Sequence, residues 1–104
     1  MEIWNPVKDY EGLYEVSSLG RVISVRKNKI LKPILNGKYF KVSLSRTHKI
    51  RIHQLVANVF LGHNTCGMKL VVDHINGDCL DNRLSNIQVV TQRENVLKSI
   101  KFKK

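Results

Sequence analysis

Residues 71–95 read VVDHINGDCLDNRLSNIQVVTQREN and bring polar residues of complementary chemistry into one short stretch. Asp73 and His74 are adjacent, Asn86 follows twelve residues after His74, and Asn95 comes nine residues later. A carboxylate and an amide oxygen are hard ligands that suit Mg²⁺, and a neutral imidazole beside them accepts a proton from water near pH 7. The stretch therefore predicts a divalent metal site next to a general base.

The same stretch also predicts its own secondary structure. Residues 70–72 are apolar and β-branched, residues 76–78 carry the turn sequence Asn-Gly-Asp, and residues 87–90 form a second β-prone run. Thr91 opens the sequence TQRE, which has the S/T-x-x-E pattern of a helix capping box. We expect a strand, a loop, a strand and a helix, with the histidine where the first strand ends and Asn95 at the fourth helical position.

Upstream of this stretch, the pattern predicts a helix preceded by β-hairpins. Apolar residues recur at helical spacing over residues 52–60, and we expect that helix to end at Gly62. Residues 14–16 and 22–25 are β-prone runs joined by a turn, in which Gly20 is free to adopt a positive φ. These two runs predict the first hairpin.

A second hairpin is expected from residues 29–35 and 39–45. Asn36 and Gly37 lie between these runs, and Asn-Gly is the dipeptide most typical of a type I′ turn. Apolar and polar residues alternate in the second run, which predicts one buried face and one solvated, basic face. The two sets are Phe40, Val42 and Leu44 against Tyr39, Lys41 and Ser43.

The composition fits a single small domain that binds a polyanion. The chain has 104 residues, of which 42% are hydrophobic, enough for one modest core. Eighteen Lys and Arg residues against eight Asp and Glu residues give a formal net charge of +10. Such an excess opposes compaction by self-repulsion unless a polyanion is near, so nucleic acid is the favoured partner.

The sequence offers no sign of a membrane segment or of an oxidising compartment. No apolar run approaches the roughly 20 residues of a membrane-spanning helix, and residues 1–10 lack the basic and apolar regions of a signal peptide. Cys66 and Cys79 belong to no CxxC or CxxH pair, so we expect free thiols and no zinc site. A disulfide between them stays open at this stage.

The segments HQLVANVFLG, DHINGD, DNRLSN and VVTQREN follow one another between residues 52 and 97. In this order they resemble the HNH endonucleases of the His-Me finger (ββα-metal) superfamily. The resemblance is to the phage and intron homing type, in which Asp-His and two later Asn residues replace His-Asn-His. It implies a DNA-cleaving enzyme that uses one divalent ion, and products with a 5′ phosphate and a 3′ hydroxyl.

A second resemblance covers the N-terminal part, which is similar to a module commonly found ahead of such nuclease domains and implies DNA binding. The matching residues are Trp4, Tyr10, Glu11, Gly12, Tyr14, Val16, Ser17, Gly20, Arg21, Val22 and Ser24. The pattern departs at Asp9, where the module often has Gly. Homing enzymes of this type usually continue beyond the position of Lys104 into further DNA-reading modules. A stand-alone nuclease of low specificity, a remnant, and a chain that obtains specificity from a partner protein all stay open.

The resemblance implies a role for each polar residue of the finger. His74 would be the general base, and Asp73 and Asn95 would bind Mg²⁺ or Mn²⁺. Asn86 would tie the loop between the strands and support the histidine. Asn82 lies close in sequence and could exchange roles with Asn86, but is otherwise a loop residue. From spacing alone, a structural histidine, a turn-capping aspartate and a helix-start asparagine are the competing interpretations.

Other polar residues are expected to serve the structure. Asp78 and Asp81 would cap turns, and His48 and His63 would lie on the surface. His53 would pack against the finger or touch phosphate, with the structural use favoured.

Basic residues near the site and on the polar strand face are candidates for phosphate contacts. They are Lys38, Lys41, Arg46, Lys49, Arg51, Arg83 and Arg93. A solvated strand face explains Lys38 and Lys41 equally well, whereas Arg83 and Arg93 flank the proposed site. The aromatic residues expected to fill a small core, and not to stack on bases, are Trp4, Tyr14 and Tyr39.

Together these inferences predict an α+β fold in which N-terminal β-hairpins precede a helix and a C-terminal ββα-metal finger. Residues 1–50 would form the β-rich module and residues 51–104 the nuclease finger, within one compact unit. The expected function is hydrolysis of DNA by water that His74 activates; the alternative is a non-catalytic DNA- or RNA-binding module. We expect a cytoplasmic, bacterial or phage-encoded protein that acts on DNA as a monomer or homodimer.

Overall fold

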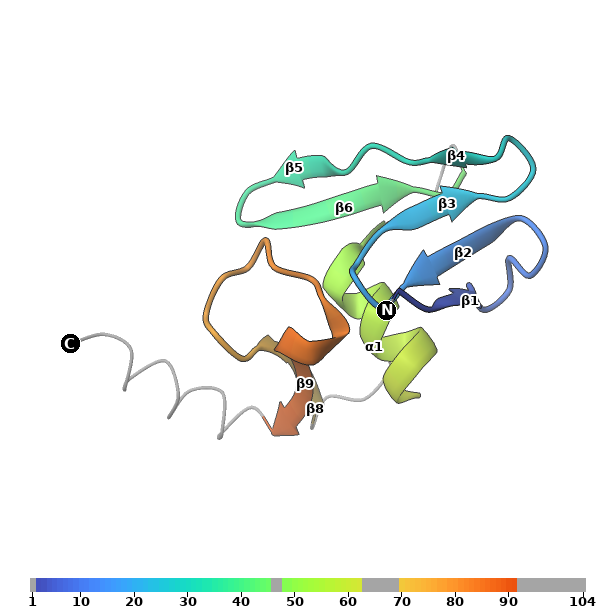
Figure 1. The fold of residues 1–104 in the computed structure, drawn as a ribbon. Helices are drawn as coiled ribbons and strands as arrows, with labels where there is room; N and C mark the ends of the chain where they lie inside the picture. Colours follow the sequence, from blue (N-terminus) through green and yellow to red (C-terminus); the bar gives the residue numbers. More distant parts are fainter. Residues whose placement is uncertain (1, 46–47, 63–69, 92–104) are drawn as a thin grey trace.

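The computed structural model describes residues 2–45, 48–62 and 70–91 (Figure 1). Its first sheet is antiparallel and has the strand order β1-β2-β3-β4. These strands are β1 (Trp4–Pro6), β2 (Tyr14–Ser17), β3 (Val22–Ser24) and β4 (Lys29–Ile30). The second sheet has the order β5-β6-β7, and a separate strand pair, β8 and β9, follows the helix α1.

The first predicted hairpin is present as β2 and β3. Val16 pairs with Val22, and the turn between them places Gly20 at a φ of 82°. A second residue with positive φ explains a departure noted in the sequence. Asp9 has a φ of 69°, and an aspartate tolerates this left-handed region better than most residues, while glycine adopts it without steric cost.

The second predicted hairpin needs two corrections. The expected strand over residues 29–35 is wrong, because β4 pairs with β3 while β5 (Ile34–Asn36) pairs with β6 (Tyr39–Ser43). Pro33 lies between them and has no N–H to continue a ladder. The turn is also shifted by one residue: Asn36 pairs with Tyr39, so Gly37 and Lys38 are its central residues, and the positive φ is at Gly37 (65°) and not at Asn36.

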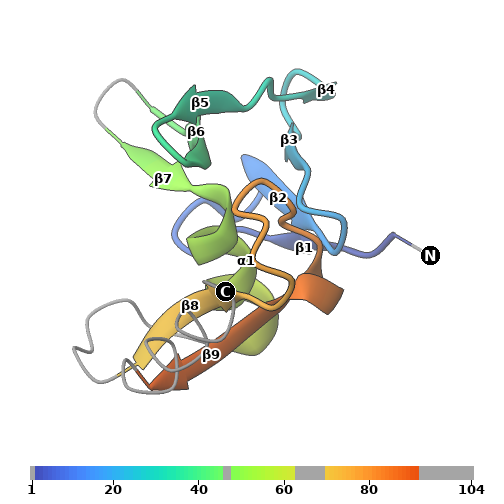
Figure 2. The same ribbon diagram turned by 90° about the vertical axis from the view of Figure 1, so that its left-hand side faces the viewer.

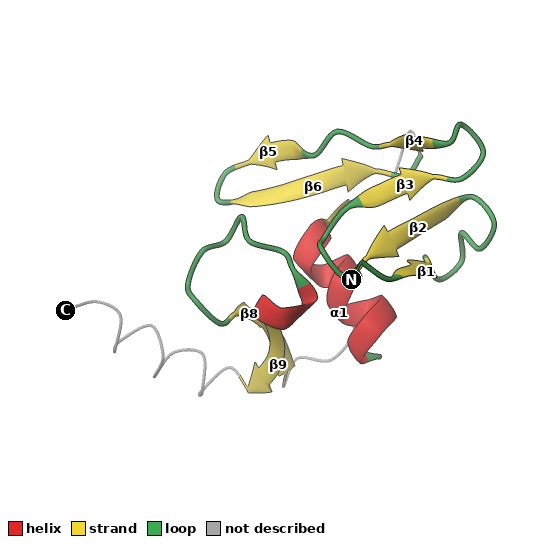
Figure 3. Cartoon of the chain, in the orientation of Figure 1, coloured by secondary structure: helices red, strands yellow, loops and turns green. Residues whose placement is uncertain are grey.

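The predicted helix is α1 (Ile52–Leu61), which directly follows β7 (Lys49–Arg51). It ends as expected at Gly62, whose φ of 66° lets its N–H bond to the carbonyl of Ala57. In Figure 3 the helix lies between the N-terminal sheets and the β8–β9 pair. The apolar face of α1 packs into one hydrophobic core, to which residues from both halves of the chain contribute. The buried core residues are Val7, Val16, Val22, Val42, Leu44, Ile52, Leu55, Val56, Ala57 and Ile87.

The finger strands β8 (Leu70–His74) and β9 (Ile87–Thr91) are antiparallel, with His74 opposite Ile87. The loop between them ends in a short 3-10 helix, Leu84–Asn86. Figure 2 shows this loop in orange, running back along α1 toward the N-terminal strands. The helix expected after Thr91 lies outside the described residues. Among the described residues, no helix is both long and apolar enough to cross a membrane.

Candidate active site

Asp73 and His74 are the last two residues of β8, and both side chains are buried. Strand pairing sets Asp73 opposite Gln88 of β9, and the Gln88 amide Nε2 donates a hydrogen bond to the Asp73 carboxylate Oδ2 at 2.8 Å. The β-ladder therefore places a carboxylate next to an imidazole, and a neighbouring amide orients that carboxylate.

Asn86 ties the loop that follows His74. Its side-chain oxygen accepts a bond from the Asn76 backbone N–H at 2.9 Å. Its amide nitrogen donates to the Asn76 side-chain oxygen at 3.0 Å and to the Asp81 carbonyl at 2.9 Å. The turn itself is closed by Asp78, whose N–H bonds to the Asn76 side chain at 2.8 Å. The start and end of the loop are thus joined through one buried amide.

The side chain of Asn82 lies within hydrogen-bond distance of the ring of His74. The His74 Nε2 and the Asn82 Oδ1 lie 2.8 Å apart, and both side chains are buried. The family resemblance favours Asn86 over Asn82 as the support of His74, and spacing within an irregular loop does not show which of the two amides points inward. The presence of a second asparagine four residues away was the available signal.

Aromatic rings connect the finger to the second sheet. Tyr39 stacks on His53 with ring centroids 4.8 Å apart, and His53 lies 4.9 Å from His74. The Arg51 guanidinium lies 4.8 Å over the Tyr39 ring. The expectation that Tyr39 fills the core is therefore wrong, since its position at the start of β6 leaves it half-buried beside the finger.

The environment of His53 keeps its ring neutral. Burial, together with the nearby charges of His74 and Arg51, lowers the pKa of His53 to about 4. Its Nδ1 is buried without a hydrogen-bond partner among the described residues. The burial of His53 and its ring contacts with Tyr39 and His74 favour a structural role over a phosphate contact.

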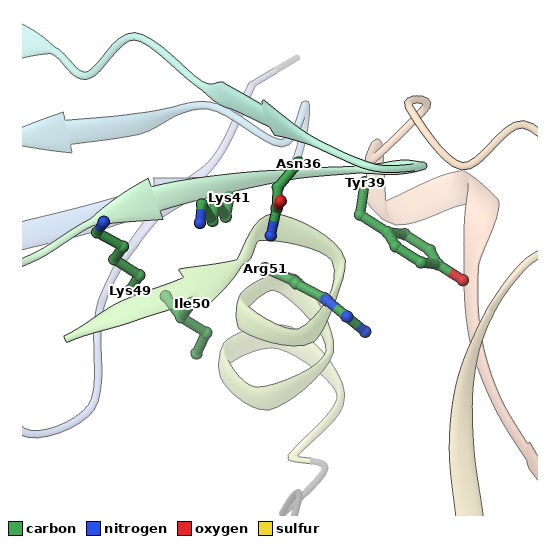
Figure 4. A pocket seen from close by; sticks show the side chains of 6 residues that line it. All are labelled: Asn36, Tyr39, Lys41, Lys49, Ile50 and Arg51. Atoms are coloured by element: carbon green, nitrogen blue, oxygen red, sulfur yellow. The ribbon is translucent and has the colours of Figure 1, made fainter.

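A hollow of about 220 Å³ lies on the basic face of β6 and β7. Asn36, Tyr39, Lys41, Lys49, Ile50 and Arg51 line it (Figure 4). In the close-up, the side chains of Tyr39 and Arg51 point the same way, toward the finger. Three of the predicted phosphate contacts, Lys41, Lys49 and Arg51, thus share one groove, while Lys38 is exposed in the adjoining turn.

Arg83 is engaged within the loop. Its guanidinium donates to both carboxylate oxygens of Asp81 at 2.8 Å, and this pairing lowers the pKa of Asp81 to about 2. A phosphate contact by Arg83 would compete with this ion pair. The other predicted contacts Arg46 and Arg93, and the predicted metal ligand Asn95, lie outside the described residues.

Two family models match consecutive parts of the chain. Residues 2–45 match the NUMOD4 motif, and residues 51–97 match an HNH endonuclease family. The chain belongs to the HNH endonucleases. Both resemblances predicted from the sequence, the finger and the N-terminal module, are thereby confirmed.

Curated HNH relatives include phage and viral proteins. The chain is 38% identical over 97 residues to the DNA endonuclease I-HmuI of Bacillus phage SP01, covering 89% of this chain and 55% of that protein. It is 33% identical over 100 residues to the H-N-H endonuclease F-TflI of Escherichia phage T5, covering 92% and 51%. An uncharacterized HNH endonuclease of Acanthamoeba polyphaga mimivirus is 42% identical over 101 residues, covering 91% and 25%. The chain spans about half or less of these relatives.

A solved structure of DNA binding and cleavage by the HNH homing endonuclease I-HmuI has the same fold. The TM-score is 0.83 at 34% identity, and the match covers 95% of this chain and 58% of that one. The predicted α+β arrangement of hairpins, helix and finger strands is therefore confirmed.

Proposed function

We propose that this HNH chain hydrolyses phosphodiester bonds of DNA, with His74 as the general base. The observation that carries the proposal is the placement of His74 at the end of β8, adjacent to Asp73 and hydrogen-bonded to Asn82. A buried imidazole of fixed orientation next to a carboxylate suits proton abstraction from water beside a bound ion.

In the proposed reaction, the imidazole of His74 accepts a proton from a water molecule. The water oxygen attacks the phosphorus, the bond from phosphorus to the 3′ oxygen breaks, and the leaving 3′ oxygen takes up a proton from solvent. The products carry a 5′ phosphate and a 3′ hydroxyl. The neutral ring of His53 packs beside His74 and adds no charge that would repel the histidinium formed in this step.

The donor chemistry at the end of β8 fits a hard divalent cation. Asp73 offers an anionic oxygen ligand whose carboxylate is oriented by Gln88. Within the described ranges, no cluster of three or more His, Cys, Asp or Glu side chains forms a richer site. Asp73, with Asn95 as second ligand, would hold Mg²⁺ or Mn²⁺. Such an ion would act as a Lewis acid that stabilises charge on the phosphate and the leaving oxygen.

The hollow lined by Lys41 and Arg51 is the proposed path of the DNA backbone. Arg51 lies over Tyr39, and Tyr39 lies over His53 and is 6.1 Å from His74 between ring centroids. A DNA backbone whose phosphates bind along β6 and β7 would thus reach His74, the proposed general base. We rank Arg51 and Lys41 above Lys38, and Arg83 below them because Asp81 already pairs with it.

The test is conversion of supercoiled plasmid by the purified chain with Mg²⁺ or Mn²⁺, with EDTA as the control. Metal-dependent appearance of open-circle DNA supports the proposal, and its order relative to linear DNA separates nicking from double-strand cutting. Plasmid that is bound but stays supercoiled with either ion contradicts it and favours a non-catalytic DNA-binding module.

A further inference from the structure

The hydrogen bond between His74 and Asn82 indicates which ring nitrogen carries the proton. An amide oxygen only accepts hydrogen bonds, so the His74 Nε2 donates to the Asn82 Oδ1 across their 2.8 Å separation. A neutral imidazole carries one proton, which leaves the lone pair on Nδ1. This hydrogen bond favours the Nε2–H tautomer and helps to orient the ring.

Asn82 is itself held by the N-terminal module. The turn at residues 17–21 packs against it so closely that a Cβ on Gly20 would lie 2.7 Å from the Asn82 carbonyl oxygen and 2.9 Å from the Asn82 Cβ. Two residues further along the loop, the Leu84 N–H bonds to the Ser18 carbonyl at 2.7 Å. The segment that carries Asn82 thus rests on the turn at Gly20 and is hydrogen-bonded to it at Leu84.

Side-chain hydrogen bonds and an ion pair stabilise the turn at residues 17–21. Ser17 is fully buried, and its hydroxyl oxygen accepts bonds from the N–H groups of Leu19 at 3.2 Å and Arg21 at 3.1 Å. Arg21 in turn forms an ion pair with Glu2. A turn stabilised in this way can hold the loop that packs against it in a defined position.

We propose that Asn82 is a positioning residue for His74, and that the turn at residues 17–21 holds Asn82 in place. This inference rests on the proposed function of His74 as the base. The N-terminal module then supports catalysis through the finger loop, in addition to any contact that it makes with DNA.

The first test compares Asn82→Leu with Asn82→Asp. Leucine keeps the branched shape and removes the acceptor, whereas aspartate keeps both the shape and the acceptor. We expect Asn82→Leu to lower kcat by roughly 10- to 100-fold, as loss of an orienting partner does at metal-dependent sites, with the KM for plasmid within about two-fold. Asn82→Asp, assayed on the alkaline side of neutrality so that the imidazole stays neutral, should stay within a few-fold of wild type.

A packing role for Asn82 predicts the opposite order. The side chain is only 6% exposed, so a buried carboxylate would disturb the fold while leucine would fill the space. Leucine at least as active as aspartate therefore overturns the inference. Thermal melts of both variants identify any that does not fold.

A second measurement is independent of cleavage. In a chain labelled with ¹⁵N-histidine, the ring nitrogen shifts report the tautomer of neutral His74. We expect the proton on Nε2 in wild type and in Asn82→Asp, and a faster-exchanging ring proton in Asn82→Leu. A proton on Nδ1 in wild type overturns the inference. A wild-type chain that cuts no DNA contradicts the proposed function, and the NMR result still decides the role of Asn82.

Two glycines isolate the contribution of the turn. Gly20 and Gly12 have nearly the same φ, 82° and 83°, but a Cβ on Gly12 would meet nothing within 4 Å. Alanine strains the backbone equally at both positions and clashes with Asn82 only from position 20. We expect Gly20→Ala to lower kcat as Asn82→Leu does, and Gly12→Ala to keep the wild-type kcat. Equal kcat values for the two variants would show that the turn does not hold Asn82.

Discussion

At the scale of single residues, His53 links stability to pH. Its folded pKa of about 4 lies below the ordinary histidine value of 6.5. Between these values the unfolded chain binds a proton that the folded chain does not, so stability falls as pH drops from 6.5 toward 4 and levels off below. From this lowering of the pKa, we expect a full loss of about 3 kcal/mol from this group.

Urea unfolding of wild type and His53→Phe, each at about pH 7.5 and about pH 4.5, measures this term. Phenylalanine keeps a ring against Tyr39 and does not titrate, so the variant should lose less stability on acidification by about 2–3 kcal/mol. An equal loss in both chains would assign the pH dependence to other groups.

Some neighbours in the candidate site can be predicted from the sequence, and others cannot. The strand end brought Asp73 and His74 together as predicted, because adjacent residues at the end of a strand need no tertiary information. The choice between Asn82 and Asn86 as partner of His74 depends on how an irregular loop folds, and no periodicity encodes that. The proximity of Arg83 to the site predicts a phosphate contact, but its pairing with Asp81, two residues away, is a local alternative.

At the scale of elements, we expect the basic face of β6 and β7 to contribute to the salt dependence of DNA binding. The double variant Lys41→Gln with Arg51→Gln should weaken DNA binding and reduce the slope of log affinity against log salt by about 2, because each phosphate contact contributes about 0.9. Arg26→Gln with Lys27→Gln removes the same charge from the exposed connection between β3 and β4.

Fluorescence anisotropy with a labelled duplex, repeated over a salt series, measures both slopes. The control pair should leave the slope within error of wild type. If both pairs change the slope equally, the chain binds DNA through its overall charge and not through the groove beside His74.

The elements themselves were mostly predictable, and the errors have local causes. The helix and the finger strands have strong periodicity or β-branched runs, and Gly62 marks the helix end with its left-handed backbone. Pro33 divided a run that hydrophobicity alone read as one strand. The shift of the second turn to Gly37 and Lys38 follows from strand pairing, which a dipeptide preference does not determine.

At the scale of the whole molecule, the two matched family regions share one core. Val16 and Val22 from the first sheet are buried in the same cluster as Leu55 and Val56 of α1. We expect the module and the finger to unfold together, with Trp4 fluorescence and far-ultraviolet circular dichroism giving coincident transitions. An earlier fluorescence transition would show that the N-terminal module unfolds independently, and would weaken its assigned role in supporting the finger.

His74 is proposed to perform the chemistry and not merely to help to bind DNA. The most direct measurement determines the cleavage rate and the DNA affinity of wild type and His74→Ala on the same plasmid, with Mg²⁺ or Mn²⁺. We predict a loss of cleavage of at least about 100-fold, the lower range for a general base, with affinity unchanged within a few-fold. Retained cleavage, or a loss of cleavage that matches an equal loss of binding, would show that His74 is not the general base.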